Sequence, residues 1–260
     1  MDRASELLWE MMGDGISPGV DLFNCIIHGL CMEKRLGEAG ELLNRMPRLG
    51  CAPDVVSYTV FIKGLCAVGN TSLAIELLPK MTVDGVGCKP DMVTYNTLIV
   101  ALCKEGAMDT ASTLFEEMTR MGVAPNVISY NCIIHGHSVL GHWKEAIRIF
   151  KEMVDRGMSP DVVTFGALMK SLCKQEKTSE VHKLLHLVAK IGEKPDTILY
   201  NTLLDGYCQE GHIDEASKVL DSMLSNGLEV KVHSYTIVIS GYSKNQSMVE
   251  AVHLFKENAT

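Results

Sequence analysis

The 260-residue sequence has no apolar run approaching the roughly 18 residues needed to cross a bilayer, because glycine or a charged residue interrupts every one. Its nine cysteines form no C-x-x-C pairs, which argues against a disulfide framework or a zinc site. The N-terminal segment MDRASELLWEMM lacks the apolar stretch of a secretory signal and, being acidic, the composition of a mitochondrial presequence. We therefore expect neither a membrane span nor a targeting peptide in this chain.

Motifs of common catalytic sites are missing as well. The sequence has no G-x-S-x-G elbow, no phosphate-binding P-loop and no zinc-deaminase signature. His182 and His186 lie four residues apart, but no third metal ligand accompanies them, and His135, His137 and His142 are interpreted as surface or groove residues. We expect no enzyme activity, no metal site, no cofactor and no small-molecule substrate.

A basic excess is also lacking, since the formal net charge is −8. Proteins that bind nucleic acid mainly through phosphate attraction usually carry a basic surface. The overall charge therefore counts against any binding to nucleic acid that depends on phosphates alone.

What the sequence does contain is a repeat. Glycines recur every 35 residues, with one longer step of 37, at Gly15, Gly50, Gly85, Gly122, Gly157, Gly192 and Gly227. An alanine series and an aromatic series share this period and the same two-residue insertion, which we place in residues 86–89. A fixed period of this length indicates a repeat architecture.

Each repeat is predicted to be a helical hairpin. In the repeat at residues 92–126, Tyr95 and Leu98 belong to an apolar face with helical spacing, and a second such face follows around Phe115. Gly122 then offers the positive φ that suits a helix C-terminus, and Pro125 prevents the helix from continuing. One hairpin cannot bury both of its faces, so neighbouring hairpins must stack.

The predicted fold is therefore all-α, an α-solenoid superhelix of stacked helix-turn-helix repeats of 35 residues. Methionines at one position of the second helix are predicted to fill the gaps between hairpins. They are Met11, Met46, Met81, Met118, Met153 and Met223. The cysteines that recur in the first helix are interpreted as core thiols of a protein in a reducing compartment.

We assign residues 1–260 to one solenoid. Partial repeats are predicted at residues 1–19 and 232–260. Six full repeats are predicted at residues 20–54, 55–91, 92–126, 127–161, 162–196 and 197–231. Because no polar capping helix is visible at either end, we expect the sequence to be a fragment of a longer protein.

The units MVTYNTLIVALCKEGAMDTASTLFEEMTRMGVAPN and VVSYTVFIKGLCAVGNTSLAIELLPKM closely resemble pentatricopeptide repeats (PPR) of the pure 35-residue type. The recurring cysteines resemble those of the restorer-of-fertility-like branch of plants. They are Cys31, Cys66, Cys103, Cys173 and Cys208. The tetratricopeptide repeat, which binds peptides, has a period of about 34 residues and a Trp, Leu-Gly, Tyr signature that is missing here.

The resemblance implies a reader of single-stranded RNA in which each repeat binds one base. In the family, the fifth and the last residue of a repeat are the principal base-reading positions. The matching residues are Asn24, Thr59, Asn96, Asn131 and Asn201 at the fifth position and Asp54, Asp91, Asn126, Asp161 and Asp196 at the last. Gly166 at a fifth position and Lys231 at a last position depart from the pattern, so no base is assigned to their two repeats.

Hydrogen-bond polarity independently favours these positions as base readers. A carboxylate only accepts, so aspartate should select U or G, whereas an amide can present either polarity and should discriminate less. The family's code gives U, G, C or U, and U for the first four repeats, read 5′ to 3′. The alternative interpretation is that the aspartates only cap helices and the asparagines are solvated.

Two further sets of residues follow from the resemblance. Aliphatic second residues of the repeats sandwich bases in the family, and here they are Val56, Val93, Ile128, Val163 and Ile198. Asp21 and His233 break that series. Lysines at the thirteenth position often face phosphates, and Lys104, Lys174 and Lys244 match them, which weakens the objection from net charge.

Three functions remain open. The first is RNA binding in organellar RNA processing, stability or translation, in mitochondria or alternatively in chloroplasts. The second is a protein-binding α-solenoid scaffold, and the third is a subunit that recruits a separate protein effector. The RNA interpretation requires the fifth residues, among them Asn24 and Asn131, to lie on one accessible surface with the last residues. Burial or outward placement of these residues would count against it.

Overall fold

The computed structural model describes residues 2–83, 88–175, 177, 180, 181, 184, 187 and 196–244. Over these residues the chain is helical and has no β-strand, so the all-α prediction is confirmed. The chain divides into two compact units, Met1–Ile133 and Ile134–Thr260, which we describe separately. None of the helices described is long and apolar enough to span a membrane.

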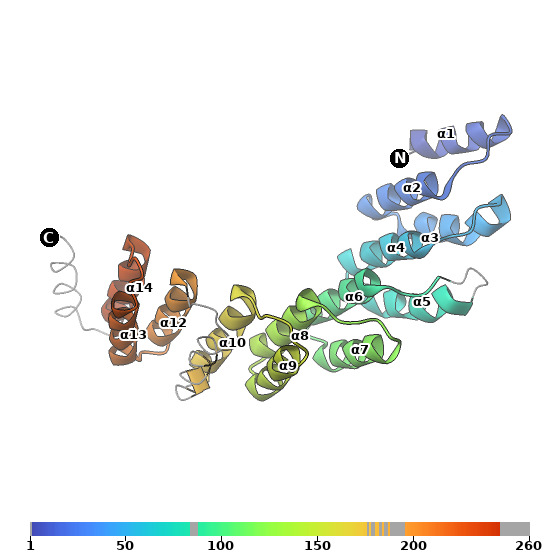
Figure 1. The fold of residues 1–260 in the computed structure, drawn as a ribbon. Helices are drawn as coiled ribbons and strands as arrows, with labels where there is room; N and C mark the ends of the chain where they lie inside the picture. Colours follow the sequence, from blue (N-terminus) through green and yellow to red (C-terminus); the bar gives the residue numbers. More distant parts are fainter. Residues whose placement is uncertain are drawn as a thin grey trace. The chain divides into compact units, whose positions relative to one another are not determined.

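In unit 1, first and second helices of successive hairpins alternate along the chain. They are α1 (Asp2–Gly13), α2 (Val20–Met32), α3 (Leu36–Arg45), the 3-10 helix η1 (Met46–Leu49), α4 (Val55–Ala67), α5 (Thr71–Val83), α6 (Met92–Glu105), α7 (Met108–Arg120) and the start of α8 (Val127–Val139). The first helices α2, α4 and α6 contact one another in order, and α3, α5 and α7 each pack against their own first helix (Figure 1). Unit 1 is thus a stack of helical hairpins.

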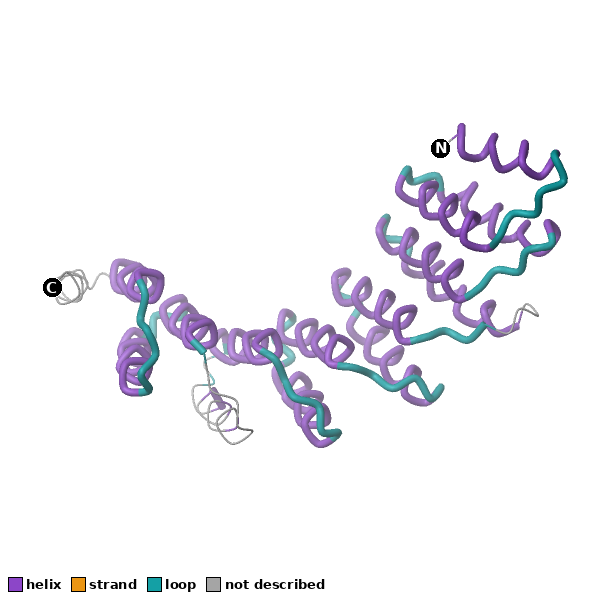
Figure 2. Tube along the Cα trace, turned by 45° about the horizontal axis from the view of Figure 1, so that its top comes forward, coloured by secondary structure: helices purple, strands orange, loops and turns teal. Residues whose placement is uncertain are grey.

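Unit 2 repeats this arrangement after the rest of α8. Its other helices in the described part of the chain are α9 (Trp143–Asp155), α10 (Val162–Lys174), α12 (Thr197–Gln209), α13 (Ile213–Ser225) and α14 (Val232–Lys244). α12 contacts both α10 and α14, and α13 packs against α12 and α14, while loops join the helices of this unit (Figure 2). The predicted helical-hairpin solenoid architecture is confirmed in both units.

The first helices begin where the sequence pattern begins its repeats, and their first turns show why. They start at Val20, Val55, Met92, Val127, Val162, Thr197 and Val232. The aspartates before four of them are N-caps that accept the backbone N–H three residues on, at 2.8 to 2.9 Å. Those aspartates are Asp54, Asp91, Asp161 and Asp196, so their capping role is confirmed. Gly122 has a φ of 80°, as predicted for the turn after a second helix.

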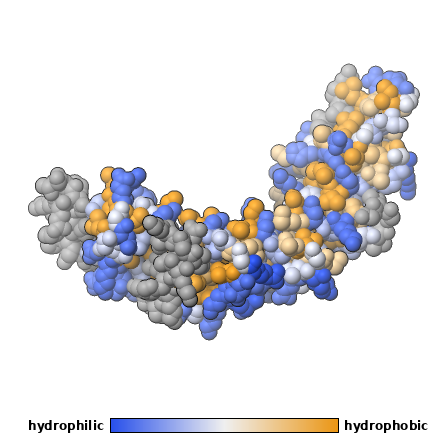
Figure 3. All heavy atoms as spheres, viewed as in Figure 1, coloured by the Kyte–Doolittle hydropathy of each residue, from blue (hydrophilic) through white to orange (hydrophobic). Residues whose placement is uncertain are grey.

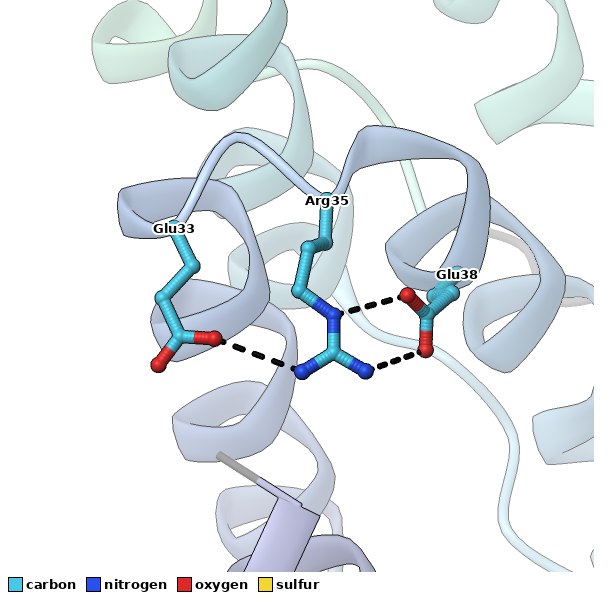
Figure 4. Close-up of polar contacts among 3 residues, drawn as sticks. All are labelled: Glu33, Arg35 and Glu38. Carbon is cyan, nitrogen blue, oxygen red and sulfur yellow. Dashed lines mark hydrogen bonds and ion pairs between the residues drawn. The ribbon is translucent and has the colours of Figure 1, made fainter.

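The turn between α2 and α3 is held by the side chain of Arg35. Its guanidinium makes two hydrogen bonds to Glu38, at 2.7 and 2.6 Å, and one to Glu33 at 3.4 Å (Figure 4). Ion pairs this exposed contribute less than about 1 kcal/mol. Arg35 therefore orients the turn of the first hairpin more than it stabilises the fold.

Small and flexible side chains fill the space within and between the hairpins. The alanines of the second helices are fully buried where described, and so are most of the methionines predicted to belong to the core. These methionines are Met46, Met81, Met118, Met153 and Met223. Met11 is only half-buried. The methionine prediction therefore holds for five positions and is weaker for the sixth.

Neighbouring first helices approach closely where a cysteine of one faces a glycine of the next. A Cβ atom added to Gly64 would lie 2.6 Å from the Cβ of Cys31, and one added to Gly206 would lie 2.8 Å from the Sγ of Cys173. All nine cysteines are free thiols. Burial raises the pKa of Cys103 and of Cys173 to about 12. Cys173 is buried, which agrees with its interpretation as a core thiol, whereas Cys103 is half-buried.

Several residues of the sequence pattern lie outside the described part of the chain. They are Gly85, Gly192, His182, His186, part of the insertion and the second helix predicted after Lys244. Among the described residues, no group of three His, Cys, Asp or Glu side chains is placed to hold a metal ion.

Candidate nucleic-acid interface

The fifth and last residues of a repeat meet the third residue of the following repeat. We call this set a junction. At the Asn96 junction, the Nδ2 group of Asn96 in α6 donates to Oδ1 of Asn126 at 3.4 Å. Ser129, near the start of α8, donates its hydroxyl to Oδ1 of Asn96 at 2.6 Å and its backbone N–H to Oδ1 of Asn126 at 3.0 Å. The two predicted readers of this repeat thus lie side by side and are held by a serine.

The Asn24 junction has the same bonds. Asn24 donates to Oδ1 of Asp54 at 3.3 Å, and Ser57 donates its hydroxyl to Oδ1 of Asn24 at 2.6 Å. Burial acts to raise the pKa of Asp54, but the hydrogen bonds from Ser57 and Asn24 outweigh it and hold this pKa below its ordinary value. Asn24 is only 7% exposed, so little of its amide is accessible. Asn24 therefore does not meet the requirement of an accessible fifth residue, whereas Asp54 is half-buried.

Threonines replace the amide and the serine at the Thr59 junction. The hydroxyls of Thr59 and Thr94 lie 2.8 Å apart, and the Thr94 hydroxyl donates to Oδ1 of Asp91 at 2.8 Å. Thr59 is half-buried and Asp91 is exposed. The hydrogen bonds to Asp91 all end on Oδ1, so Oδ2 has no partner among the described residues.

A groove of about 660 Å³ on unit 1 brings four of the predicted classes of residue together. Asn96 and Asn126, the fifth and last residues of one repeat, line it. The aliphatic second residues Val93 and Ile128 and the thirteenth-position Lys104 line it too. Base-edge donors and acceptors, apolar side chains and a cation therefore share one concavity.

Unit 2 has a groove of about 450 Å³ with a similar lining and one break in the pattern. Asn201 lies in it together with Ile198, His233 and Lys174. At this junction Lys231 stands in the last position and forms an ion pair with Glu229 at 3.4 Å instead of bonding Asn201. Within the described residues, Oδ1 of Asn201 is buried without a hydrogen-bond partner. The sequence rightly singled out this repeat as a departure.

Two further junctions have a last residue in unit 2. Asp161 caps α10 through Thr164, and Asp196 caps α12 through the backbone N–H of Leu199. Gly166 supplies no side chain to the second of these junctions. Asn131, the fifth residue before Asp161, is half-buried.

The predicted base-sandwiching residues are all exposed. They are 53 to 62% exposed and comprise Val56, Val93, Ile128, Val163 and Ile198. Exposed hydrophobic residues lie among hydrophilic ones on the face of the chain drawn in Figure 3. β-Branched residues this exposed contribute little to the core.

Comparisons with known proteins identify the family of the repeats. The family model described as "PPR repeat family" matches residues 18–67, 53–99, 90–137, 125–174 and 195–244. The "PPR repeat" model matches residues 163–192 and 233–257. The chain belongs to the PPR repeat family. No curated protein matches this PPR chain.

Solved PPR structures share its fold at low identity. PPR10 in complex with an 18-nucleotide psaJ RNA element is 24% identical with a TM-score of 0.53, over 97% of this chain and 42% of that one. The PPR domain of Arabidopsis thaliana protein-only RNase P 1 in complex with tRNA is 18% identical with a TM-score of 0.57, over 76% and 98%. At these identities the likeness shows the fold alone. This chain spans less than half the length of the PPR10 chain.

The structure adds PPR positions that the sequence analysis missed. Lys63 and Lys170, the ninth residues of their repeats, line the two grooves together with Lys104 and Lys174. Their shared place in the repeat could have pointed to them. The third-position hydroxyls could not be found in this way, because serine or threonine three residues after an aspartate is also the ordinary pattern of a capping box. Lys244 lies in a smaller hollow of about 160 Å³.

Proposed function

We propose that this PPR chain binds single-stranded RNA and reads one base per repeat along its first helices. The observation that carries the proposal is the groove of unit 1, where Asn96, Asn126, Val93, Ile128 and Lys104 lie together. Reading an unpaired base requires hydrogen-bonding groups for its edge and apolar surface for its faces. The RNA complexes of PPR10 and of the RNase P PPR domain support the same class of ligand.

The last residue of each repeat faces the ring nitrogen at the centre of the Watson-Crick edge. Asp54 and Asp91 can only accept there, so they select the N–H of uracil or guanine. At Asn126 the backbone N–H of Ser129 occupies Oδ1 at 3.0 Å, which leaves the Nδ2 donor for the base. A donor at this point selects the ring nitrogen of cytosine over the N–H of uracil.

In the family, repeats with asparagine at the fifth position prefer pyrimidines. This preference and the donor of Asn126 together predict the bases U, G, C and U for the first four repeats. The fourth pair, Asn131 and Asp161, rests on sequence alone. We assign no base to the repeats at residues 162–196 and 197–231.

The net charge of −8 counts against binding to phosphates, but the charge near the groove of unit 1 is more favourable. Lys63 and Lys104 line the unit 1 groove, where they can meet the phosphates of a bound strand. Only one acidic residue, Glu105, lines the same groove, and its carboxylate is engaged by the hydroxyl of Thr71 at 2.6 Å. The groove therefore has a more positive local balance than the chain as a whole.

The finer assignments rest on resemblance. We place the protein in the pure 35-residue type of the family and in its restorer-of-fertility-like plant branch. On the same basis we propose an organellar role in RNA processing, stability or translation, in mitochondria before chloroplasts. A separate protein effector would then act on the bound transcript.

The test is binding of the whole chain to short single-stranded RNAs at fixed moderate salt. An RNA containing UGCU should bind more tightly than RNAs with one changed base, by about 1–3 kcal/mol per change. Asp91→Asn should move the preference at the second base from G to A, because the amide can turn a donor toward the ring nitrogen. Asp109→Asn, in the exposed first turn of α7, is the matched control and should leave every preference unchanged.

Equal binding of all these RNAs by the wild type would contradict base reading. No binding at all would favour the protein-binding scaffold, for which the acidic net charge is suitable.

A further inference from the structure

A hydroxyl group stands at the third position of the following repeat in each junction of unit 1. Ser57, Thr94 and Ser129 are all fully buried, and each contacts both the last and the fifth residue of the repeat before it. A helix cap needs only the contact to the last residue. The contact to the fifth residue calls for another explanation.

The bonds of Ser129 fix the direction of its hydroxyl proton. The backbone N–H of Asn126 donates to the Ser129 oxygen at 3.2 Å, so the hydroxyl must donate elsewhere. Two acceptors are within reach, Oδ1 of Asn96 at 2.6 Å and Oδ1 of Asn126 at 3.0 Å, and the shorter bond goes to Asn96. If the Asn96 amide were turned over, its oxygen would face Oδ1 of Asn126 across the 3.4 Å now bridged by Nδ2, which is repulsive. Asn96 is therefore held with its N–H donors toward Asn126 and the groove.

At the Thr59 junction the fifth residue offers an acceptor to a ligand instead of a donor. The Thr94 hydroxyl donates to Oδ1 of Asp91 at 2.8 Å. Its oxygen then accepts the proton of Thr59, whose oxygen is 2.8 Å away. Because the Thr59 hydroxyl donates its proton to Thr94, its oxygen can only accept a hydrogen bond from a ligand. One junction presents a donor at the fifth position and the other presents an acceptor.

In unit 2, replacement of one residue of a junction goes together with the loss of the hydrogen bonds of the others. Where the fifth residue is Gly166, the third position of the next repeat is Leu199, so the two polar side chains are lost together. Where Lys231 replaces the last residue, the oxygens of Asn201 and of Ser234 are both buried and neither has a hydrogen-bond partner in the described part of the chain. The three positions of a junction thus act as a set.

We propose that the third residue of the following repeat is a positioning residue whose hydroxyl holds the fifth residue in one orientation, with a donor toward the base where the fifth residue is asparagine and an acceptor where it is threonine. This inference rests on the proposed RNA reading. A donor at the fifth position matches O2 of a pyrimidine, whereas an acceptor matches the N2 amino group of guanine. The fifth residue thereby sets the choice between pyrimidine and guanine, the third residue holds it in the orientation that this choice needs, and the last residue sets the match at the ring nitrogen.

The test compares two ratios of affinity for Ser129→Ala, measured with the whole chain and RNAs that differ only at the third base. The preference for C over A should fall about fivefold, because the Asn96 amide is no longer held as a donor. The preference for C over U should not change, because the backbone N–H of residue 129 still orients Asn126. A loss of folding alone would weaken all RNAs equally and leave both ratios unchanged.

Two control variants complete the design. Ser129→Thr keeps the hydroxyl, as in the natural Thr94 junction, and should restore the C over A ratio. Ser234→Ala removes a third-position hydroxyl that has no partner among the described residues and should change neither ratio.

The outcomes separate the two proposals. A selective wild type whose Ser129→Ala variant keeps its C over A ratio would overturn the positioning role and leave RNA reading intact. A wild type without any base preference would overturn both.

Discussion

Gly64→Ala tests whether the close approach of neighbouring first helices is essential to the stack. Gly64 lies in the interior of α4 and is buried against α2. A Cβ atom at this position would lie 2.6 Å from the Cβ of Cys31 and 3.4 Å from Cδ2 of Leu36. No side-chain rotation can move the Cβ of Cys31, so the backbones of the two helices must shift to relieve this contact.

Two opposing effects decide the result. Replacing glycine by alanine inside a helix stabilises it by about 1 kcal/mol. Overpacking of a well-packed contact costs about 1–3 kcal/mol. Because separating α2 from α4 also disturbs the other core contacts between them, we expect the upper part of that range and a net loss of about 1–2 kcal/mol.

The measurement is urea unfolding followed by circular dichroism. Gly166→Ala is the matched control, since Gly166 lies inside α10 and a Cβ there would meet nothing within 4 Å. It should gain about 0.5–1 kcal/mol from helix propensity alone. If Gly64→Ala were as stable as the wild type, or gained stability as Gly166→Ala should, the cysteine-glycine contact would not limit the approach of the helices.

Three further predictions concern the junctions and the thiols. Asn126→Asp keeps the oxygen that accepts the backbone N–H of Ser129 but replaces the donor that faces the base by an acceptor. Competition binding should therefore show the preference at the third base moving from C to U by about 1–3 kcal/mol. An unchanged preference would contradict the role of Asn126. Iodoacetamide at mildly alkaline pH should label the exposed Cys25 first and the buried Cys173 only after denaturation, because burial raises the pKa of Cys173 to about 12. Equal labelling rates in peptide mass spectrometry would count against the burial of Cys173. The lowered pKa of Asp54 stabilises the fold fully above the unfolded pKa near 4, and this contribution is lost as pH falls through the lower folded value. The acid loss of stability between about pH 5 and pH 2 should therefore be smaller in Asp54→Asn, and identical pH profiles would refute this assignment.

The periodic part of the fold could be predicted from the sequence because each repeat carries its own signals. The glycine at Gly122, the apolar face around Tyr95 and the methionine at Met118 are local features, and a 35-residue period multiplies them. The bounds of the first helices follow from the aspartate caps for the same reason. Repeat domains are favourable cases, since each hairpin depends only on its neighbours.

Contacts between repeats were harder to foresee. The pattern places Cys31 and Gly64 on helices that stack, but it does not say which residue of one helix meets which residue of the next. The burial of Asn24, compared with the half-buried Asn96, depends on the packing around one junction. Amide orientation has the same origin, because the direction of Asn96 is set by a hydroxyl 33 residues away in sequence.

In the structure, the last residue of a repeat can cap a helix and still contact a base. Asp91 caps α6 through Oδ1 alone, and its other oxygen remains available to a base. Asparagine caps a helix about as well as aspartate, as Asn126 does through its own Oδ1. Under the proposed function, exchange of aspartate and asparagine at a last position would change the base that is read and leave the helix start almost unaffected. A stack built in this way can acquire a new RNA target at little cost in stability, provided that the third-position hydroxyl is kept.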